Sequence, residues 1–207
     1  MAAPQVSPAA RPGSLCANGK GGQMQTLAAS SEITAPAEVV WQVVSDFASY
    51  PEWNPFIVRA TGEQRPGARL QVTIAAPGVR AVTFKPTVLD LRSGRLIRWK
   101  GRLLVPGLFD GRHALSVDPL GDGRARFTTH EEVTGVLLPF LGKVMKASQE
   151  GFERMAAAVK VRAEALSTES AGARPPQVAV PGAEAPPATP PRPKTQSTAP
   201  RSETGAP

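Results

Sequence analysis

Residues 47–55 read FASYPEWNP and place two prolines and three aromatic rings in nine positions. The segment before them carries apolar residues at helical spacing, namely Val39, Val40, Val43, Val44 and Phe47. This spacing predicts an amphipathic helix, with Thr34 as its N-cap and Pro36 in its first turn, where a missing N–H costs nothing. The chain therefore enters the nine-residue stretch from the end of a helix.

The stretch itself predicts a corner between helix and strand. Ser49 is placed to cap a second short helix that has Pro51 in its first turn. Asn54 precedes Pro55, which disfavours the α region for Asn54, so the chain must leave as extended structure. Residues 56–58 are then expected to form a strand. The aromatic rings either staple this corner or form the rim of a pocket.

Composition divides the 207 residues into three parts. Residues 1–23 and 168–207 are poor in large apolar side chains and cannot bury enough surface to offset the entropy of ordering. We therefore predict a disordered leader at 1–23, a folded domain at 24–167 and a disordered, Pro- and Ala-rich tail at 168–207. The sequence has no signal-peptide pattern and no segment of transmembrane length, so a cytoplasmic protein is expected. Whether translation starts at Met1 or at Met24 stays open.

The charge of the chain is positive but unevenly distributed. The whole sequence has 24 Lys and Arg against 17 Asp and Glu, a net charge of +7, whereas residues 24–167 carry only 18 against 14. One basic run stands out, and it consists of Arg92, Arg95, Arg98, Lys100 and Arg102. We interpret it as the solvated outer face of a strand, with a patch for weak contact to an anionic membrane or to nucleic acid as the alternative. No specific binding of nucleic acid is predicted.

Six β-like runs follow the corner, separated by turn signals such as APG, SG and LGDG. They predict an antiparallel meander over residues 56–60, 68–76, 79–91, 94–104, 108–118 and 124–136. Pro86 interrupts the third run, and proline cannot donate to a sheet ladder, so a bulge or an unpaired edge is expected there.

Alternation and turn length together predict which side chains point inward. A two-residue turn at 93–94 pairs Arg92 with Arg95. The resulting inner-face pairs are Trp99 with Val88 and Leu103 with Phe84. The side chains predicted to point outward are Arg98, Lys100 and Arg102.

The last two runs have their apolar residues at alternating positions, at Phe109, Leu115, Val117, Phe127 and Val133. Pairing Leu115 with Phe127 puts these residues on one inner face. The same register brings His113 opposite Thr129, with Glu131 diagonal to it. His130 and Glu132 turn outward. Two polar groups, His113 and Glu131, are thus predicted inside the sheet.

Residues 137–166 predict one long amphipathic helix of roughly 40 Å. Its apolar stripe consists of Leu141, Met145, Ser148, Phe152, Met155, Val159, Ala163 and Leu166. Gly142 and Gly151 are predicted to lie inside this helix. Each costs about 1 kcal/mol relative to alanine, so a packing or access reason is expected.

Four segments carry a resemblance to a known superfamily. They are SEITAPAEVVWQVVSDFASYPEWNPF (31–56), RLIRWKG (95–101), GRHALSV (111–117) and RFTTHEEVTGVLLPFLG (126–142). The chain resembles the START/Bet v 1-like (SRPBCC) superfamily, within its polyketide cyclase/dehydrase and lipid transport group. The resemblance implies an α+β helix-grip fold, in which a curved seven-stranded antiparallel sheet surrounds a long C-terminal helix and two short helices follow the first strand.

The resemblance also implies an apolar cavity between sheet and helix. The residues expected to line it are Trp53, Phe56, Phe84, Trp99, Leu103, Leu115, Phe127, Leu141, Met145 and Phe152. Binding or carriage of a small hydrophobic or amphipathic molecule is the leading functional prediction. An alternative is a cyclase or dehydratase with His113 as general base and Glu131 orienting it. Another is a protein or membrane adaptor that uses the basic strand and the Pro-rich tail.

The sequence offers no motif for a metal or a cofactor. It holds two histidines and one cysteine, Cys16, and that cysteine lies in the predicted leader. An intrachain disulfide is therefore impossible, and no zinc site and no cofactor are predicted. The identity of the ligand, the pathway and the oligomeric state do not follow from the sequence.

Overall fold

The computed structural model describes residues 23–102 and 107–172. The predicted leader and tail therefore lie largely outside the described residues, as do Cys16 and Leu103. The first strand begins at Gln23 and the last helix ends at Gly172, five residues beyond the predicted domain limit of Ser167.

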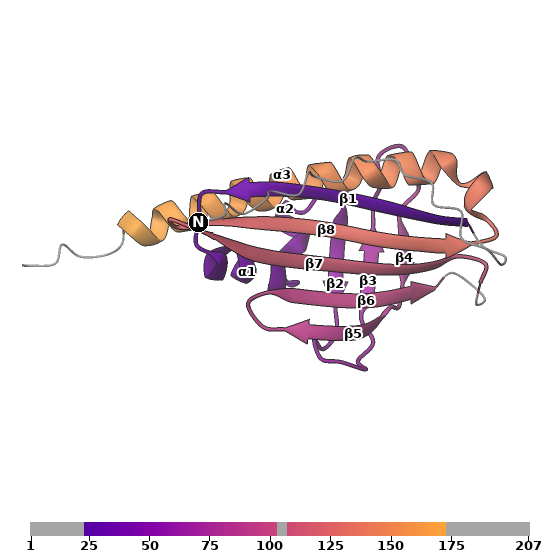
Figure 1. The fold of residues 1–207 in the computed structure, drawn as a ribbon, viewed down its shortest axis with the longest axis horizontal. Coiled ribbons are helices and arrows are strands. Elements are labelled where there is room, and N and C mark those ends of the chain that lie inside the picture. The colour runs from indigo at the N-terminus through magenta and orange to yellow at the C-terminus, as the bar shows by residue number, and fades with distance from the viewer. Residues whose placement is uncertain (1–22, 103–106, 173–207) are drawn as a thin grey trace, which may run out of the picture. The chain divides into compact units, whose positions relative to one another are not determined.

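The elements follow the predicted order of strand, two helices, strands and a long helix (Figure 1). The opening elements are β1 (Gln23–Ile33), α1 (Ala37–Ser45) and α2 (Tyr50–Trp53). The strands that follow are β2 (Ile57–Thr61), β3 (Gln71–Ile74), β4 (Val82–Phe84), β5 (Thr87–Arg92), β6 (Leu96–Arg102), β7 (Asp110–Gly121) and β8 (Arg124–Gly135). The chain then forms a 3₁₀ turn, η1 (Leu138–Phe140), and the helix α3 (Gly142–Gly172).

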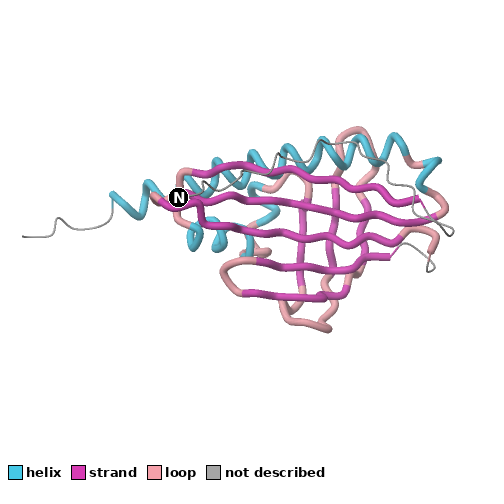
Figure 2. Tube along the Cα trace, viewed as in Figure 1, coloured by secondary structure: helices cyan, strands magenta, loops and turns pink. Residues whose placement is uncertain are grey.

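The strands form two antiparallel sheets, with the orders β1-β8-β7-β6-β5 and β2-β3-β4. Figure 2 shows the three-stranded sheet crossing behind the five-stranded one at a steep angle. Residues 67–70 connect the two sheets, because Val88 donates to Ala68 O over 2.9 Å and Leu70 donates to Pro86 O over 2.9 Å. Helix α3 packs against β1, β8 and α1. This arrangement is the helix-grip fold.

Pro86 explains why there are eight strands rather than the predicted seven. It lies between β4 and β5, which belong to different sheets, so the predicted run 79–91 is not a single strand. Phe84 consequently pairs with Val72 on β3, and its predicted partner, Leu103, lies outside the described residues.

The β5–β6 turn is one residue longer than predicted. Arg92 pairs with Leu96, not with Arg95, and Gly94 adopts a φ of 79° within a three-residue loop. Three-residue hairpin loops commonly need such a left-handed residue. A bulge between Val88 and Asp90 compensates for the extra residue, so the predicted pairing of Val88 with Trp99 is confirmed.

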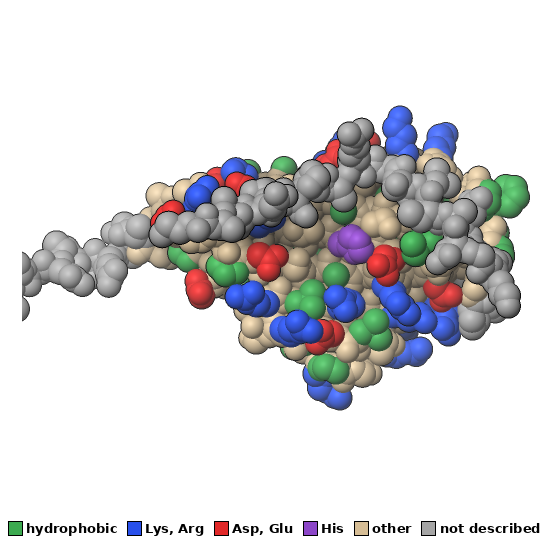
Figure 3. Space-filling model, in the orientation of Figure 1, with side chains coloured by type: hydrophobic (Ala, Val, Ile, Leu, Met, Phe, Trp, Pro, Cys, Tyr) green, Lys and Arg blue, Asp and Glu red, His purple; other side chains and the backbone are tan. Residues whose placement is uncertain are grey.

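The outer face of the five-stranded sheet carries the basic side chains expected there. Arg98 and Arg102 are exposed, and Lys100 is half-buried. Figure 3 shows Lys and Arg side chains on this face together with Asp and Glu side chains, as on an ordinary solvated surface.

The β7–β8 register differs by two residues from the predicted one. Val117, not Leu115, lies opposite Phe127, and His113 lies directly opposite Glu131. The two strands extend to a two-residue turn at Asp122 and Gly123, whose φ angles of 52° and 68° are typical of a type I′ hairpin. A shift of two residues preserves the side-chain faces, so His113 still points inward.

The corner at residues 47–55 forms as predicted, but its caps differ. Pro36, not Thr34, occupies the N-cap of α1. The Thr34 N–H donates instead to Glu164 Oε1 on α3 over 2.9 Å. Ser49 precedes α2 without capping it through its side chain, and Asn54 is extended, with φ −86° and ψ 112°.

Helix α3 begins later than predicted. Residues 138–140 form the separate turn η1, so Gly142 is the first residue of α3 rather than an interior one. Gly151 has a packing reason, because a Cβ at this position would overlap the ring of the buried residue Phe56. The buried face of α3 consists of Met145, Ala147, Phe152, Met155, Ala156, Val159 and Ala163.

Candidate functional site

A cavity of about 260 Å³ lies between the two sheets and the first turns of α3. One wall comes from β3, β4 and the loop between them, and the opposite wall from β6, β7 and β8. The lining residues are Phe56, Ile74, Ala76, Val79, Arg80, Val82, Phe84, Gly101, Arg102, Phe109, Gly111, Glu131, Leu141, Val144, Met145 and Ser148. Most of these side chains are apolar, so the cavity favours apolar ligand surface.

Two glycines help to open this space. Gly101 on β6 lies directly opposite Gly111 on β7. A Cβ on Gly101 would lie 3.1 Å from the ring of Phe84, and one on Gly111 would lie 2.6 Å from Glu131 Oε1. Larger residues at these positions would therefore displace two of the groups that line the cavity.

Charged side chains occur at the wall and at the rim. Arg102 pairs with Asp110, with 3.0 Å between Nε and Oδ1. The Gly107 N–H and the Arg102 guanidinium hold the pKa of Asp110 below its usual value, which keeps this carboxylate ionised. Arg80 is exposed on the β3–β4 loop, and no carboxylate of the described residues lies within ion-pair distance of it. Arg80 is thus available to a ligand that carries an anionic group.

Glu131 and His113 form a polar pair at the inner face of the sheet. Glu131 lines the cavity, whereas His113 is only 3 % exposed and lies behind it. Glu131 Oε2 lies 3.9 Å from His113 Nδ1, which is too long for a direct hydrogen bond. The carboxylate therefore faces the cavity with at least one oxygen free to accept a proton or a hydrogen bond from a ligand.

The imidazole ring of His113 is held on three further sides. It stacks on Trp99 with 4.7 Å between ring centroids and meets Phe152 edge-on at 5.2 Å. Its Nε2 lies 3.3 Å from Thr129 Oγ1. These contacts fix the ring plane, so His113 can support Glu131 in only one orientation.

The structure brings some of the sequence-predicted residues to the cavity and leaves others in the core. Phe56, Phe84, Leu141, Met145 and Glu131 line the cavity. Trp99, Leu115, Phe127 and Phe152 are buried in the core and are not among the lining residues, and Trp53 is half-buried at the corner. Leu103 lies outside the described residues.

The rings of the opening stretch act mainly as staples. Tyr50 lies 5.2 Å from Phe47 and 5.1 Å from Trp53 between ring centroids, and its hydroxyl donates to Val44 O over 2.6 Å. Burial raises the pKa of Tyr50 far above its usual value, so the hydroxyl stays a donor. Phe56 is the ring of this region that reaches the cavity.

Sequence reasoning missed Arg80 and the glycine pair. Arg80 follows the turn signal APG at 76–78, but the turn alone gives no hint that it faces a cavity. Glycines inside strands do indicate close approach of other groups, and Gly101 and Gly111 could have been identified on that basis.

The described residues show neither a metal site nor a spanning helix. Within 23–102 and 107–172, no three His, Cys, Asp or Glu side chains come together in a way that could hold a metal ion. In the same residues, no helix is both long and apolar enough to cross a membrane.

The helix-grip architecture and a family match place the chain in the START/Bet v 1 superfamily. Residues 24–164 match the family described as polyketide cyclase / dehydrase and lipid transport. The chain belongs to this family. Among curated proteins, none matches the chain.

Solved structures share the fold. A START superfamily protein from Mycobacterium smegmatis is 26 % identical, with a TM-score of 0.56 over 68 % of this chain and 98 % of its own. The Zhui aromatase/cyclase from Streptomyces sp. R1128 is 16 % identical, with a TM-score of 0.54 over 72 % and 96 % of the two chains. Truncated norcoclaurine synthase from Thalictrum flavum is 15 % identical, with a TM-score of 0.53 over 70 % and 96 %. At such identities the last two show a common fold alone.

Proposed function

We propose that the protein binds or carries a small hydrophobic or amphipathic molecule in the cavity between its two sheets and α3. The observation that carries this proposal is a largely apolar space of about 260 Å³ with a carboxylate on its wall. Membership of a family whose description includes lipid transport supports the same assignment.

The cavity volume limits the size of the ligand. A dry cavity of about 150 Å³ accommodates benzene, and sites for drug-sized ligands begin at about 300 Å³. The cavity of about 260 Å³ lies between these values. A molecule of one or two rings, or a short branched chain, fits this space, and Arg80 or Glu131 would receive its polar group.

A cavity-filling variant tests this proposal. Val144 lines the cavity from α3, so Val144→Trp is expected to fill it and to abolish binding of a small apolar probe such as 1-naphthol. Val161 lies on the same helix and is 70 % exposed, so Val161→Trp is a matched control that should bind as wild type. Isothermal titration calorimetry measures both. Unchanged binding in Val144→Trp would contradict the assignment of the site.

The geometry of Glu131 also supports a second candidate, an enzyme of the cyclase or dehydratase type. A carboxylate on the wall of an apolar cavity, with a fixed imidazole 3.9 Å behind it, is suited to proton transfer. In this proposal Glu131 would contact the substrate and act as the general base, and His113 would orient Glu131. The two roles predicted from the sequence are the other way round.

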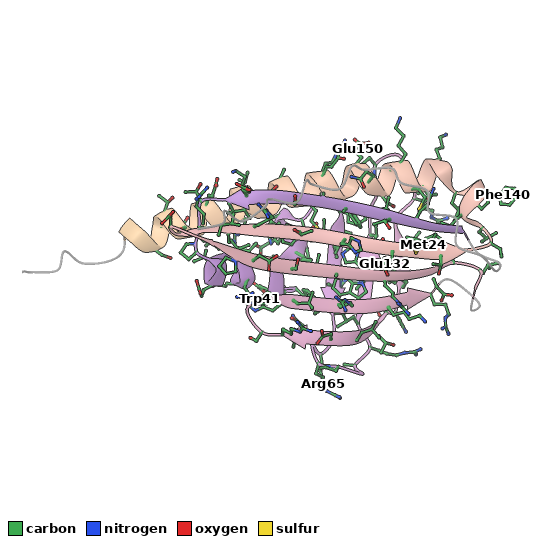
Figure 4. The ribbon with its side chains drawn as sticks, viewed as in Figure 1. Met24, Trp41, Arg65, Glu132, Phe140 and Glu150 are labelled. Atoms are coloured by element: carbon green, nitrogen blue, oxygen red, sulfur yellow. The ribbon has the colours of Figure 1, made fainter. Side chains whose placement is uncertain are left out.

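Proton exchange distinguishes the two candidates. An enzyme of this type should catalyse deuterium incorporation beside the carbonyl of a bound aryl ketone such as 1-tetralone in D₂O, and Glu131→Gln should abolish the exchange. Glu132→Gln is the control, because Glu132 follows directly but lies on the outer face of β8 (Figure 4). Tight binding of the ketone without exchange would leave the carrier as the function.

A further inference from the structure

The segment that leads from β8 to α3 exposes large apolar side chains at one end of the domain. Phe140 is 83 % exposed and Val136 is 56 % exposed, and Pro139 between them is also exposed. Met24 at the start of β1 is 44 % exposed, and β1 contacts η1. Figure 4 shows Phe140 projecting from the end of the domain at which α3 begins. We call Met24, Val136, Pro139 and Phe140 the apolar tip.

The backbone of the apolar tip is well fixed, so the exposure of Phe140 does not reflect a frayed segment. The Phe140 N–H donates to Leu137 O over 2.9 Å within η1. The Val136 N–H donates to Gly107 O over 3.2 Å, which ties the segment to the turn that precedes β7. Leu138, at 2 % exposure, anchors the turn in the core. The fold thus holds a phenyl ring in solvent, which suggests a partner outside the chain.

The chain segment that contains Val136, Pro139 and Phe140 carries only positive charges. Residues 133–149 contain Lys143 and Lys146 but no Asp or Glu. Both lysines are exposed, and neither forms an ion pair with any residue in the described ranges. They lie in the first turns of α3, where the helix dipole favours acidic residues, so helix stability does not explain them.

We propose that the apolar tip docks onto an anionic lipid surface, with Phe140 inserted at the acyl boundary and Lys143 and Lys146 among the headgroups. An aromatic side chain flanked by basic residues is the combination that interfacial binding requires. Leu141 and Val144, next to the tip, line the cavity, so docking places the cavity beside the membrane. This inference does not depend on what the cavity binds.

A second copy of the chain is a less suitable occupant. Phe140 exposes on the order of 170 Å², since a phenylalanine side chain contributes roughly 200 Å². A partner in a stable protein interface contributes about 800 Å². The apolar tip consists of four residues, which together cannot supply that area, whereas insertion into a bilayer needs only one ring and nearby cations.

Vesicle co-sedimentation of the full chain tests the proposal. The wild-type protein is expected to bind vesicles of phosphatidylcholine and phosphatidylglycerol in equal parts, to bind pure phosphatidylcholine weakly, and to be released by added salt. Phe140→Asp should weaken binding at least tenfold. The matched control is Val161→Asp, which places the same charge on another exposed apolar residue of the domain and should leave binding unchanged.

Charge reversal gives an independent measure. Each lysine near an anionic surface contributes about fivefold to binding, so Lys143→Glu and Lys146→Glu should each weaken it by at least that factor. Phe140→Trp should show a blue-shifted emission maximum on adding vesicles, and Val161→Trp should not.

Three outcomes would overturn the proposal. The first is retention of vesicle binding by Phe140→Asp. The second is loss of binding only when Arg98 and Lys100 on the outer face of β6 are reversed, which would move the contact to the basic strand. The third is a dimer in native mass spectrometry that Phe140→Asp dissociates, which would make the apolar tip a contact between copies.

Discussion

The contact between Gly151 and Phe56 connects the fold to the cavity, and Gly151→Ala tests it. A Cβ at position 151 would overlap the ring of Phe56, which is only 1 % exposed. The ring also packs edge-on against Phe152, with 5.2 Å between centroids, so it cannot move freely in that direction. The space left to it is the cavity that it lines.

Two opposing effects determine the size of the change. Alanine is favoured over glycine inside a helix by about 1 kcal/mol. Overpacking a filled core costs about 1–3 kcal/mol. Because the added Cβ would overlap the ring of Phe56, we expect a cost of about 3 kcal/mol. The expected net loss is about 2 kcal/mol, equivalent to a fall in Tm of roughly 4–8 °C for a domain of this size.

Urea unfolding followed by tryptophan fluorescence measures the loss, and two variants serve as controls. Gly142→Ala meets no atom within 4 Å and should change stability by less than about 0.5 kcal/mol. In a Phe56→Leu background, Gly151→Ala should cost at least about 1 kcal/mol less than in wild type. A Gly151→Ala protein as stable as wild type would refute the placement of Phe56 and, with it, one wall of the cavity.

Three further predictions concern single polar groups. His113→Phe and Glu131→Gln should be non-additive in stability by at least about 0.5 kcal/mol, whereas additive losses would show that the pair at 3.9 Å is not coupled. The Thr34 N–H holds the pKa of Glu164 below its usual value. The ionised carboxylate therefore stabilises the fold at any pH above the unfolded-state pKa of about 4.3. This stabilisation is lost as the pH falls through the lower pKa of the folded state. The stability gap between wild type and Glu164→Gln should therefore be complete at neutral pH and close in acid, and a constant gap in thermal unfolding across this range would contradict the assignment. Asn54 is buried and accepts two backbone N–H groups over 3.0 Å, so Asn54→Ala should cost about 2 kcal/mol in chemical denaturation, and a loss below about 0.5 kcal/mol would contradict those bonds.

Side-chain faces in the sheet could be predicted from the sequence because they depend on a period of two. His113 and Leu115 point inward in the structure, as alternation along residues 109–117 predicts. The β7–β8 register was in error by two residues, and such a shift leaves every side chain on its own face. The inward position of Glu131 was therefore found even though its direct partner was not.

Exact register, strand number and the cavity itself were decided by the tertiary structure. The bulge at 88–90 compensates for the extra residue in the β5–β6 loop. No residue within 88–90 predicts this bulge from the sequence alone. Pro86 predicts an interruption of the strand, but the sequence does not show that β4 and β5 on either side of it belong to different sheets.

The residues that line the cavity likewise could be predicted from the sequence only in part. The resemblance implied that Phe56, Leu141, Met145, Trp99 and Phe127 all line the cavity, but only the first three do so, and Trp99 and Phe127 are buried in the core. Which of them meet open space depends on how closely segments far apart in the chain approach one another, as Gly151 does with Phe56 and Gly111 with Glu131. Periodicity is a property of neighbouring residues and can be read from the sequence, whereas empty volume is a property of the assembled elements and exists only once they have packed.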